Sequence, residues 1–577
     1  MHWIDWLVLT GFFIYTLWDG LRQQTKTSTL EDLMLARRSV PWWAAGISVM
    51  ATQASAITFI GTTGQAYMED MRFLQVYLGL PLAMIILSGT LVPFFYRTRA
   101  STAYELLERR FGLRVRLTTS FLFLLSRGAS LGITIAAPAY VLALILGVPL
   151  DWTILLIGIT ATIYTMFGGI AGVIRTDMKQ MVLMLGGLVF CFFWIGREMP
   201  TGLSFGESLT LAGAAGKLQT IDLSFDPGQK YNLWSGLLAG LFLMLSYFGA
   251  DHSQVQRYLT ARSLTDARGS LLLSAVVKIP IQFFILLLGA YLYVFYLFAD
   301  RPLLFIPETY QSISATVDAS TAAADETFAH LQAERQAAAV HLAAHPQDVA
   351  ARVEFQALDQ AVAELRAREI DRLEAESQDS RNDTNYVLPY FVLTRLPVGV
   401  VGLIVAAILA AALSSIDSML NSLAASSVMD WYQRLQQSPR SDRHYLWSAR
   451  LATALWGLLA TISAIVFGET DSIIELVNEV GSYFYGPILG VFLLLWVRRA
   501  NARSALWGLA LGLGAVCLAG SFFKQPGSEV VLLRFPFAEH AKLEPVLTYL
   551  WLNPIGVAVT MLVGAMGQPA RRPGAAP

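Results

Sequence analysis

The sequence predicts an all-α membrane protein with about 13 transmembrane helices. Of its 577 residues, 55% are hydrophobic and only 14% are charged, and the mean hydropathy is +0.52. Soluble domains carry about 25% charged residues, whereas here the charges form short clusters between apolar runs of about 20 residues, the length that crosses a bilayer. This composition excludes water-soluble domains. Nucleic-acid binding is excluded as well, because no basic face remains.

The spans follow from a hydropathy window of about 19 residues. The first span has no basic leader and no small-residue cleavage site, so we interpret it as an uncleaved helix rather than a signal peptide. The expected spans are residues 3–20, 41–66, 71–96, 117–147, 151–167, 171–196, 231–250, 270–298, 397–431, 444–467, 472–497, 502–523 and 546–567.

Lys and Arg collect in alternate gaps between these spans, for example at Arg97, Arg109 and Arg498. The positive-inside rule assigns such gaps to the cytoplasm. We therefore expect a multi-pass protein of the plasma membrane, and of the inner membrane if the source is bacterial. Its N-terminus is expected outside the cell and its C-terminus in the cytoplasm.

Residues 300–385 differ from the rest of the chain. They hold 16 acidic residues, seven Arg and no Lys, and the stretch 321–376 has the pattern of two amphipathic helices broken at Pro346. We expect an acidic helical hairpin on the exocytoplasmic side. It is either a coiled excursion of the chain or a lid or partner-docking element. Its expected seam is formed by Val340, Leu342, Val349, Val353, Leu358, Val362, Leu365, Ile370 and Leu373.

Polar residues interrupt the second span between Ala51 and Thr58. A charge at the centre of a membrane helix costs about 2.5–3.5 kcal/mol on insertion scales, so polar groups at this depth are functional candidates. An unwound helix would turn free carbonyls and hydroxyls toward the protein interior, where irregular backbone is tolerated. The alternative is an intact helix whose Ser and Thr side chains bond to carbonyls one turn earlier.

A second polar run, residues 246–254, ends the seventh span. Two interrupted spans five helices apart are typical of a five-plus-five inverted repeat, in which the solute binds at the midplane between the two breaks. Asp251 lies in this run, either in a solute site or at the inner interface.

The ninth span carries oxygen-bearing side chains at helical spacing. Ser414 and Ser415 follow Ala411 by one turn, and Asp417 and Ser418 follow by another. Together with carbonyls of an unwound partner, these oxygens would form a cage for a monovalent cation. The other interpretation is close helix packing by small residues.

Two further charges lie inside predicted spans. Asp177 in the sixth span either pairs with Arg175 or Lys179 near the cytoplasmic edge or supplies negative charge to a cation route beside Ser418. Arg127 lies ten residues into the fourth span, about 15 Å along the helix axis. It either snorkels to the cytoplasm or holds an anion such as a carboxylate.

Three motifs together resemble the sodium:solute symporter family, over about residues 42–501 without the insertion. They are Ser414-Ser415 with Met419-Leu420-Asn421-Ser422, the segment from Gly168-Gly169 to Asp177, and Gln256-Arg257-Tyr258-Leu259. The resemblance implies the five-plus-five inverted-repeat core, with discontinuous first and sixth core helices and a sodium ion between the first and eighth. The sodium ligands that it implies are the carbonyls of Ala51, Ala54 and Ala411 and the hydroxyls of Ser414 and Ser415.

The resemblance also implies a second cation site. Some members of the family that this sequence resembles, including sialic acid symporters, bind a second sodium nearer the cytoplasm, and Asp177, Ser414, Asp417 and Ser418 match those positions. The resemblance therefore implies a second sodium at Asp177, Asp417 and Ser418. Asp417 departs from the serine of those relatives. Its carboxylate either strengthens cation binding or pairs with a basic residue, which leaves the count at one or two sodium ions.

The solute site is implied by two branches of the family. The sialic acid branch suggests a serine and a threonine of the second span facing the solute and an arginine holding its carboxylate, whereas sugar carriers place an asparagine where Asp251 stands, so sugar specificity does not transfer. The solute-facing residues expected here are Gln53, Ser55, Thr58, Gln75, Arg127, Asp251 and Asn478.

These observations predict five regions along the chain. They are an extra helix and cytoplasmic loop (1–40), the first repeat and start of the second (41–299), the acidic insertion (300–385), the remainder of the core (386–500), and extra C-terminal helices with a short cytoplasmic tail (501–577).

The predicted function is sodium-coupled import of a small polar solute, more consistent with a carboxylate than with a neutral sugar. The coupling ion, the solute and the lipid bilayer are the expected partners, and the oligomeric state is left open. Alternatives are a proton-coupled or sugar-type carrier on the same fold and a non-transporting membrane sensor. A membrane enzyme is not expected, because no Ser-His-Asp, metal-ligand or phosphate-loop pattern is present.

Overall fold

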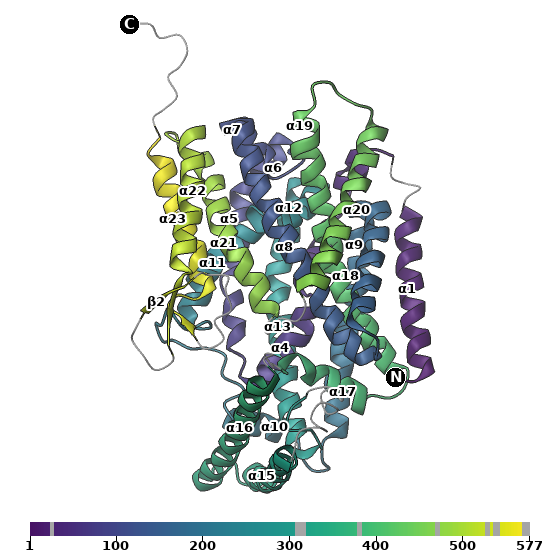
Figure 1. Cartoon of the computed structure of the whole chain (residues 1–577), viewed down its shortest axis with the longest axis vertical. Coiled ribbons are helices and arrows are strands. Elements are labelled where there is room, and N and C mark those ends of the chain that lie inside the picture. Colours follow the sequence, from purple (N-terminus) through teal and green to yellow (C-terminus); the bar gives the residue numbers. More distant parts are fainter. Residues whose placement is uncertain are drawn as a thin grey trace.

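The structure is a computed structural model that describes residues 1–23, 28–305, 319–377, 383–467, 473–525, 531–534 and 543–567. Most of these residues are helical and form one bundle of long, roughly aligned helices (Figure 1).

The helices up to the insertion follow the predicted spans. They are α1 (Trp3–Gln23), α2 (Leu30–Leu35), η2 (Ala36–Arg38), α3 (Trp42–Gln53), α4 (Ala56–Met68), η3 (Arg72–Tyr77), α5 (Leu80–Gly89), α6 (Leu91–Thr98), α7 (Glu105–Phe111), α8 (Leu113–Leu146), α9 (Leu150–Glu198), α10 (Phe205–Ala214), η4 (Ser235–Ala239), α11 (Gly240–Gly249), α12 (His252–Leu259) and α13 (Leu264–Phe298).

The insertion forms a hairpin, and the remaining spans follow it. These elements are α15 (Ala319–Ala344), α16 (Val349–Ser377), η5 (Thr384–Tyr386), α17 (Val387–Arg395), α18 (Val400–Ser426), η6 (Ser427–Tyr432), α19 (Gln433–Leu435), α20 (Asp442–Phe467), α21 (Ile473–Leu493), η7 (Leu494–Trp496), α22 (Ala502–Ala519) and α23 (Tyr549–Ala565).

Nine helices in the described ranges are long and apolar enough to cross a membrane, or ten if the bent pair α3 and α4 forms one span. The element α9 contains both the fifth and the sixth predicted spans, two helical segments that meet at a kink at Gly169, where φ is 57°. A Cβ at Gly169 would lie 2.5 Å from the Leu33 carbonyl oxygen, so only glycine fits this bend. Two predicted spans, at α11 and α23, are shorter apolar helices. The total of 13 stays a prediction.

The second span is broken, and the intact-helix alternative is therefore wrong. Helix α3 ends at Gln53, Ala54 leaves the helical region with φ −93° and ψ 58°, and the two halves of the span are bent by 53°. Ser55 then caps α4, because its hydroxyl accepts a hydrogen bond from the Thr58 amide at 3.3 Å.

The seventh span is broken at the predicted position as well. Helix α11 ends at Gly249, and Asp251 begins α12 as its cap by accepting a 2.8 Å hydrogen bond from the Ser253 amide. Ala250 lies between them with φ −127°, outside the helical region. The two discontinuous helices of an inverted repeat are thus present.

Helix α18 forms the centre of the bundle, and nearly all of its residues are buried. It packs against α9, α8, α1 and α20, and also against both halves of the broken second span. A helix that is apolar around its whole circumference is buried in protein rather than placed at a surface. The polar side chains of α18 therefore face neighbouring helices and not lipid.

The insertion is a helical hairpin, with the predicted break at residues 345–348. It lies at the same end of the bundle as the N-terminus, opposite α7 and α19 (Figure 1). The predicted topology requires this arrangement, and its assignment to the outside of the cell stays a prediction.

The expected seam of the hairpin is only partly right. Leu342 and Val362 are buried, but Val340, Val349 and Val353 are 55%, 74% and 59% exposed. Small and aromatic residues build the contact instead, because two helices can approach closely there: Ala338, Ala339, Ala351 and Phe355 are buried. The side chain of Leu373 lies outside the described residues.

A small sheet departs from the all-α prediction. The strands β1 (Phe522–Lys524), β2 (Val531–Leu533) and β3 (Glu544–Pro545) pair antiparallel in the order β2-β1-β3. The twelfth predicted span therefore ends at Ala519, and the chain turns into an extended hairpin before α23.

Candidate functional site

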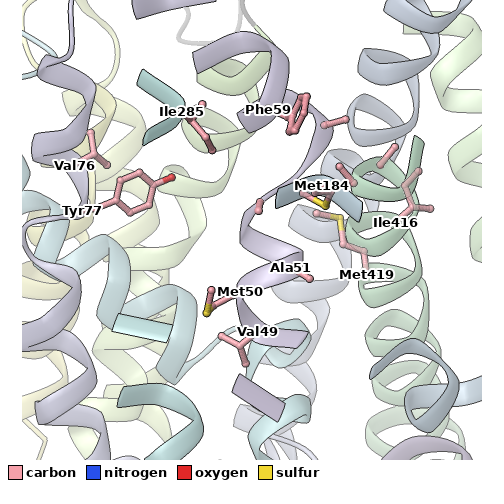
Figure 2. Packing of buried hydrophobic residues seen from close by; sticks show 14 of the residues in the cluster. Val49, Met50, Ala51, Phe59, Val76, Tyr77, Met184, Ile285, Ile416 and Met419 are labelled. Carbon is pink, nitrogen blue, oxygen red and sulfur yellow. The ribbon is translucent and has the colours of Figure 1, made fainter. Parts of the chain in front are cut away.

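The expected ligands of the first sodium ion meet where the broken second span lies against α18. Ala51, Ala54 and Ala411 are buried, and the Ser415 hydroxyl lies 3.2 Å from the Thr52 carbonyl oxygen and 3.5 Å from that of Ala411. Figure 2 shows Ala51 beside Ile416 and Met419 of α18, at the point where the chain leaves the helix. The break frees carbonyls that have no helical partner, and oxygen ligands of this kind suit a hard monovalent cation.

Asp177 connects α9 to both of these helices. It is fully buried, and its two oxygens accept hydrogen bonds from the hydroxyls of Ser414 and Ser48, each at 2.5 Å. The expected pairing with Lys179 does not occur, since Lys179 binds Asp19 at 2.7 Å. Asp177 therefore faces the predicted cation route.

Arg257 is the residue that sequence reasoning missed at this point. Its side chain is fully buried, and one guanidinium nitrogen lies 3.4 Å from Asp177 and also donates to the hydroxyl of Ser418. The other nitrogens donate to the Ser48 hydroxyl at 2.9 Å and to the Ser253 carbonyl at 2.8 Å. The guanidinium thus contacts two of the residues expected to bind a second sodium. The sequence showed Arg257 only as part of a family motif.

Asp417 lies beside this cluster without a basic partner. It is fully buried and accepts hydrogen bonds from the hydroxyls of Tyr164 and, at 3.1 Å, Ser418. Among the residues that the structure describes, none of the ion pairs involves Asp417. The expected alternative of a pair with Arg or Lys is not formed in this conformation.

Arg127 and Asp251 form a buried ion pair between α8 and the break that precedes α12. The Arg127 guanidinium also donates to the hydroxyl of Tyr485, and it lies 5.1 Å from the ring centre of Tyr247. Arg127 is 3% exposed, so it does not snorkel to the cytoplasm. Its positive charge is balanced by a carboxylate of the protein itself.

A small cavity adjoins this pair, with room for about one water molecule. The Ser126 hydroxyl, which faces it, is buried and has no hydrogen-bond partner within the described ranges. The cavity is lined by Tyr104, Phe123, Ser126, Arg127, Ser246, Ala250, Asp251, Tyr485 and Ile488.

The other expected solute residues fall into two groups. Gln53, Ser55 and Thr58 gather at the break, where the Thr58 hydroxyl donates to the Gln53 carbonyl at 3.2 Å and lies 3.3 Å from the Ser55 hydroxyl. Gln75 is buried but engaged elsewhere, since its amide binds the Tyr231 carbonyl at 3.1 Å. The side chain of Asn478 lies outside the described residues.

Lys278 completes the set and was also missed. It lies in the middle of α13, is 1% exposed, and places its ammonium 3.3 Å from the Gln53 carbonyl and 3.2 Å from the side-chain oxygen of Gln282. It also lies 4.7 Å from the ring centre of Tyr77, whose hydroxyl points toward the break in Figure 2. No carboxylate lies within 4 Å of it in the described part of the chain. A lone lysine in an apolar run was the available signal.

Comparison with known proteins places this architecture in a family. The model of the sodium:solute symporter family matches residues 33–344 and 375–512. The chain belongs to the sodium:solute symporter family. It is therefore a multi-pass membrane transporter that couples solute movement to sodium, in a family of carriers rather than enzymes. The family match omits residues 345–374, which include most of α16.

Individual relatives agree with this assignment. The chain is 29% identical over 530 residues to the sodium/sialic acid symporter SiaT of Proteus mirabilis, with 89% of each chain covered. It is 26% identical over 523 residues to a sodium/glucose cotransporter of Vibrio parahaemolyticus, covering 88% of this chain and 84% of that one.

A solved structure has the same fold along nearly the whole chain. It is a Na⁺-coupled sialic acid symporter in a substrate-bound, outward-open state, with a TM-score of 0.72, 26% identity, and coverage of 98% of this chain and 97% of that one. The predicted inverted-repeat transporter fold is confirmed.

Proposed function

We propose that this symporter imports a small organic carboxylate together with sodium by alternating access. The observation that carries the choice of solute is the buried charge at the midplane. Arg127 and Asp251 cancel each other, whereas Lys278, among the residues that the structure describes, contacts two neutral oxygens and a ring but no carboxylate. A buried charge without a counter-ion is costly, and one carboxylate would neutralise it.

The location of Lys278 supports a solute role. Its ammonium contacts the Gln53 carbonyl, next to the two hydroxyls of Ser55 and Thr58. A carboxylate bound by the ammonium would therefore lie against the unwound part of the second span. Arg127 and Asp251 then form a neutral wall of the same region, and the sialic acid relative is consistent with an acidic solute.

Sodium is proposed to bind one helical turn away from this solute. The carbonyls of Ala51, Ala54 and Ala411 and the hydroxyls of Ser414 and Ser415 would hold it, and the ion would supply positive charge that joins the broken span to α18. The Ser415 hydroxyl already bridges these elements through the Thr52 carbonyl. The ion shifts the conformational equilibrium because this contact differs between states.

Coupling follows from the shared segment. Residues 51–58 supply both the proposed sodium carbonyls and the proposed solute hydroxyls, so ordering of this segment by one ligand lowers the cost of binding the other. The effect is reciprocal in free energy: the factor by which sodium raises solute affinity equals the factor by which solute raises sodium affinity. For import, the binding site first opens to the outside and binds both ligands, and it then opens to the cytoplasm.

Thermal stability of the purified protein tests the proposal. We expect sodium, but not potassium, to raise the melting temperature, and we expect carboxylates to raise it further only when sodium is present. Ser415→Ala and Ser414→Ala should weaken the sodium response. Ser422→Ala is the matched control, because its hydroxyl bonds to the Met419 carbonyl on the same helix, at 2.9 Å. A sodium response that both variants leave intact would disprove the ion site.

A further inference from the structure

We propose that Arg257 is a tethered cation that takes the place of a second sodium ion and locks the cytoplasmic half of the transporter closed. The proposal rests on the function proposed above. It concerns α12, the second half of the broken seventh span, and the three other helices that the guanidinium reaches.

The guanidinium of Arg257 joins four helices in one buried cluster. It belongs to α12 and contacts Ser48 of α3, Asp177 of α9 and Ser418 of α18. All eight residues of α12 are buried. The helix therefore cannot leave its place between α3 and α18 unless these contacts break together.

The same cluster was expected to hold a second sodium, at Asp177, Asp417 and Ser418. Arg257 binds Asp177 and Ser418 directly, so a sodium ion at the same oxygens would lie beside the guanidinium, and the two positive charges would repel each other. Exchange of one for the other leaves the net charge of the cluster unchanged. The ion and the side chain are thus alternative occupants, and in this structure the side chain is bound.

Other positive groups nearby do not compete for the cluster. Lys179 of α9 pairs with Asp19 of α1, and Arg450 of α20 lies over the rings of Phe167 and Trp447. Helix α3 contributes only hydroxyls, from Ser48 and Thr52. Within the described residues, Arg257 is therefore the cation that balances Asp177.

Unpartnered polar atoms indicate that α12 is the part that moves. Nε2 of His252 and the side-chain oxygens of Gln254 and Gln256 are buried without a hydrogen-bond partner in the residues described here. A buried polar atom without a partner destabilises the conformation that buries it. Water entering from the cytoplasm would satisfy them, so hydration favours the open state and the Arg257 contacts oppose it.

Cysteine labelling from the cytoplasmic side tests the lock. The native thiols are first replaced by Cys191→Ser and Cys517→Ser, and Gln254→Cys provides a reporter on α12. In potassium buffer without solute, Arg257→Gln should raise the labelling rate with a membrane-impermeant thiol reagent by roughly 10- to 100-fold. Arg262→Gln is the matched control, because Arg262 is exposed and lies three residues after the end of α12. Equal rates in all three proteins would overturn the lock.

Two further measurements secure the result. Asp177→Asn should raise labelling as well, and the double variant with Arg257→Gln should show less than the product of the two increases, because both remove one ion pair. If Arg257→Gln does not fold, Ser418→Ala removes an acceptor without leaving a charge unpaired. It should raise labelling by a smaller factor, and an unchanged rate would count against the lock.

Equilibrium binding of radioactive sodium separates this proposal from the function on which it rests. Wild-type protein should bind a single ion, and Arg257→Gln should bind one more. Two ions on the wild-type protein would show that Arg257 does not replace sodium. No sodium bound to any variant would disprove sodium coupling at the first site, while the labelling result would still report on the lock.

Discussion

Replacement of Lys278 by methionine should remove the preference for carboxylates and leave the folded protein nearly as stable. The change keeps an unbranched side chain that is one atom shorter, and it removes a charge whose contacts are the Gln53 carbonyl, Gln282 and the Tyr77 ring. None of these is a carboxylate. The substitution therefore breaks no ion pair of the protein itself, but it removes the proposed partner of the solute.

The size of the effect follows from burial. Lys278 is 1% exposed, so a carboxylate that it binds is also largely removed from water. Truncation of one partner in such a buried charged pair costs about 2–5 kcal/mol, and the lower value corresponds to roughly 30-fold in affinity. The affinity for a neutral amide analogue of the same solute should fall only a few-fold in Lys278→Met, since binding of the amide depends less on the charge.

Arg127→Met is the comparison that decides between the two cations. It leaves Asp251 buried and unpaired, which costs about 3–5 kcal/mol in stability. Thermal unfolding in the absence of ligand should therefore show a lower melting temperature for Arg127→Met than for Lys278→Met.

The assay is ligand-induced thermal stabilisation in sodium, with each carboxylate measured beside its amide and with Lys278→Arg as a charge-retaining control. Equal losses for carboxylate and amide in Lys278→Met would refute the reasoning. If Arg127→Met loses more affinity for carboxylates, relative to amides, than Lys278→Met does, then Arg127 and not Lys278 binds the solute carboxylate.

Three further outcomes are expected. Ser415→Ala should weaken sodium affinity by about tenfold in a sodium titration, the loss of one oxygen ligand. Asp251→Asn in the Arg127→Gln background should restore part of the stability that Arg127→Gln loses, as measured by a double-mutant cycle of melting temperatures. The hydrogen bond from Arg37 holds the pKa of Asp32, in the first turn of α2, well below its usual range. Its stabilisation is therefore fully present above about pH 4 and is lost gradually as the pH falls toward the lowered pKa, so Asp32→Asn should lower the melting temperature at pH 7, and the difference from the wild-type protein should shrink as the pH is lowered below 4.

The breaks in the second and seventh spans could be predicted because their cause is local. Polar and small residues between apolar runs weaken a membrane helix where they stand, and the structure breaks the chain at Ala54 and Ala250, inside the runs marked by the sequence. The hairpin break at Pro346 is predictable for the same reason, since proline lacks the donor that a helix needs. Val340 and Val353 show the limit: a helical pattern identifies apolar positions but not which of them a partner helix covers.

The charged contacts could not be predicted, because they join residues far apart in the chain. Arg257 bonds to a serine 209 residues away, and Arg127 pairs with an aspartate 124 residues away. Periodicity and composition carry no information about such pairs. Lys278 and Arg127 are equally conspicuous as charges in apolar runs. Only the folded chain shows that Arg127 has a carboxylate beside it and that Lys278 has none among the described residues.

The sequence by itself determined the membrane class, the two broken helices and the oxygen-rich turn of α18, since each depends on how a short segment partitions between water, lipid and protein. The tertiary structure alone decided which buried charges are neutralised, because a charge is stabilised by whatever lies within a few ångströms of it in space. That difference places the unpaired cation at Lys278, and it puts a guanidinium where a second sodium ion was expected.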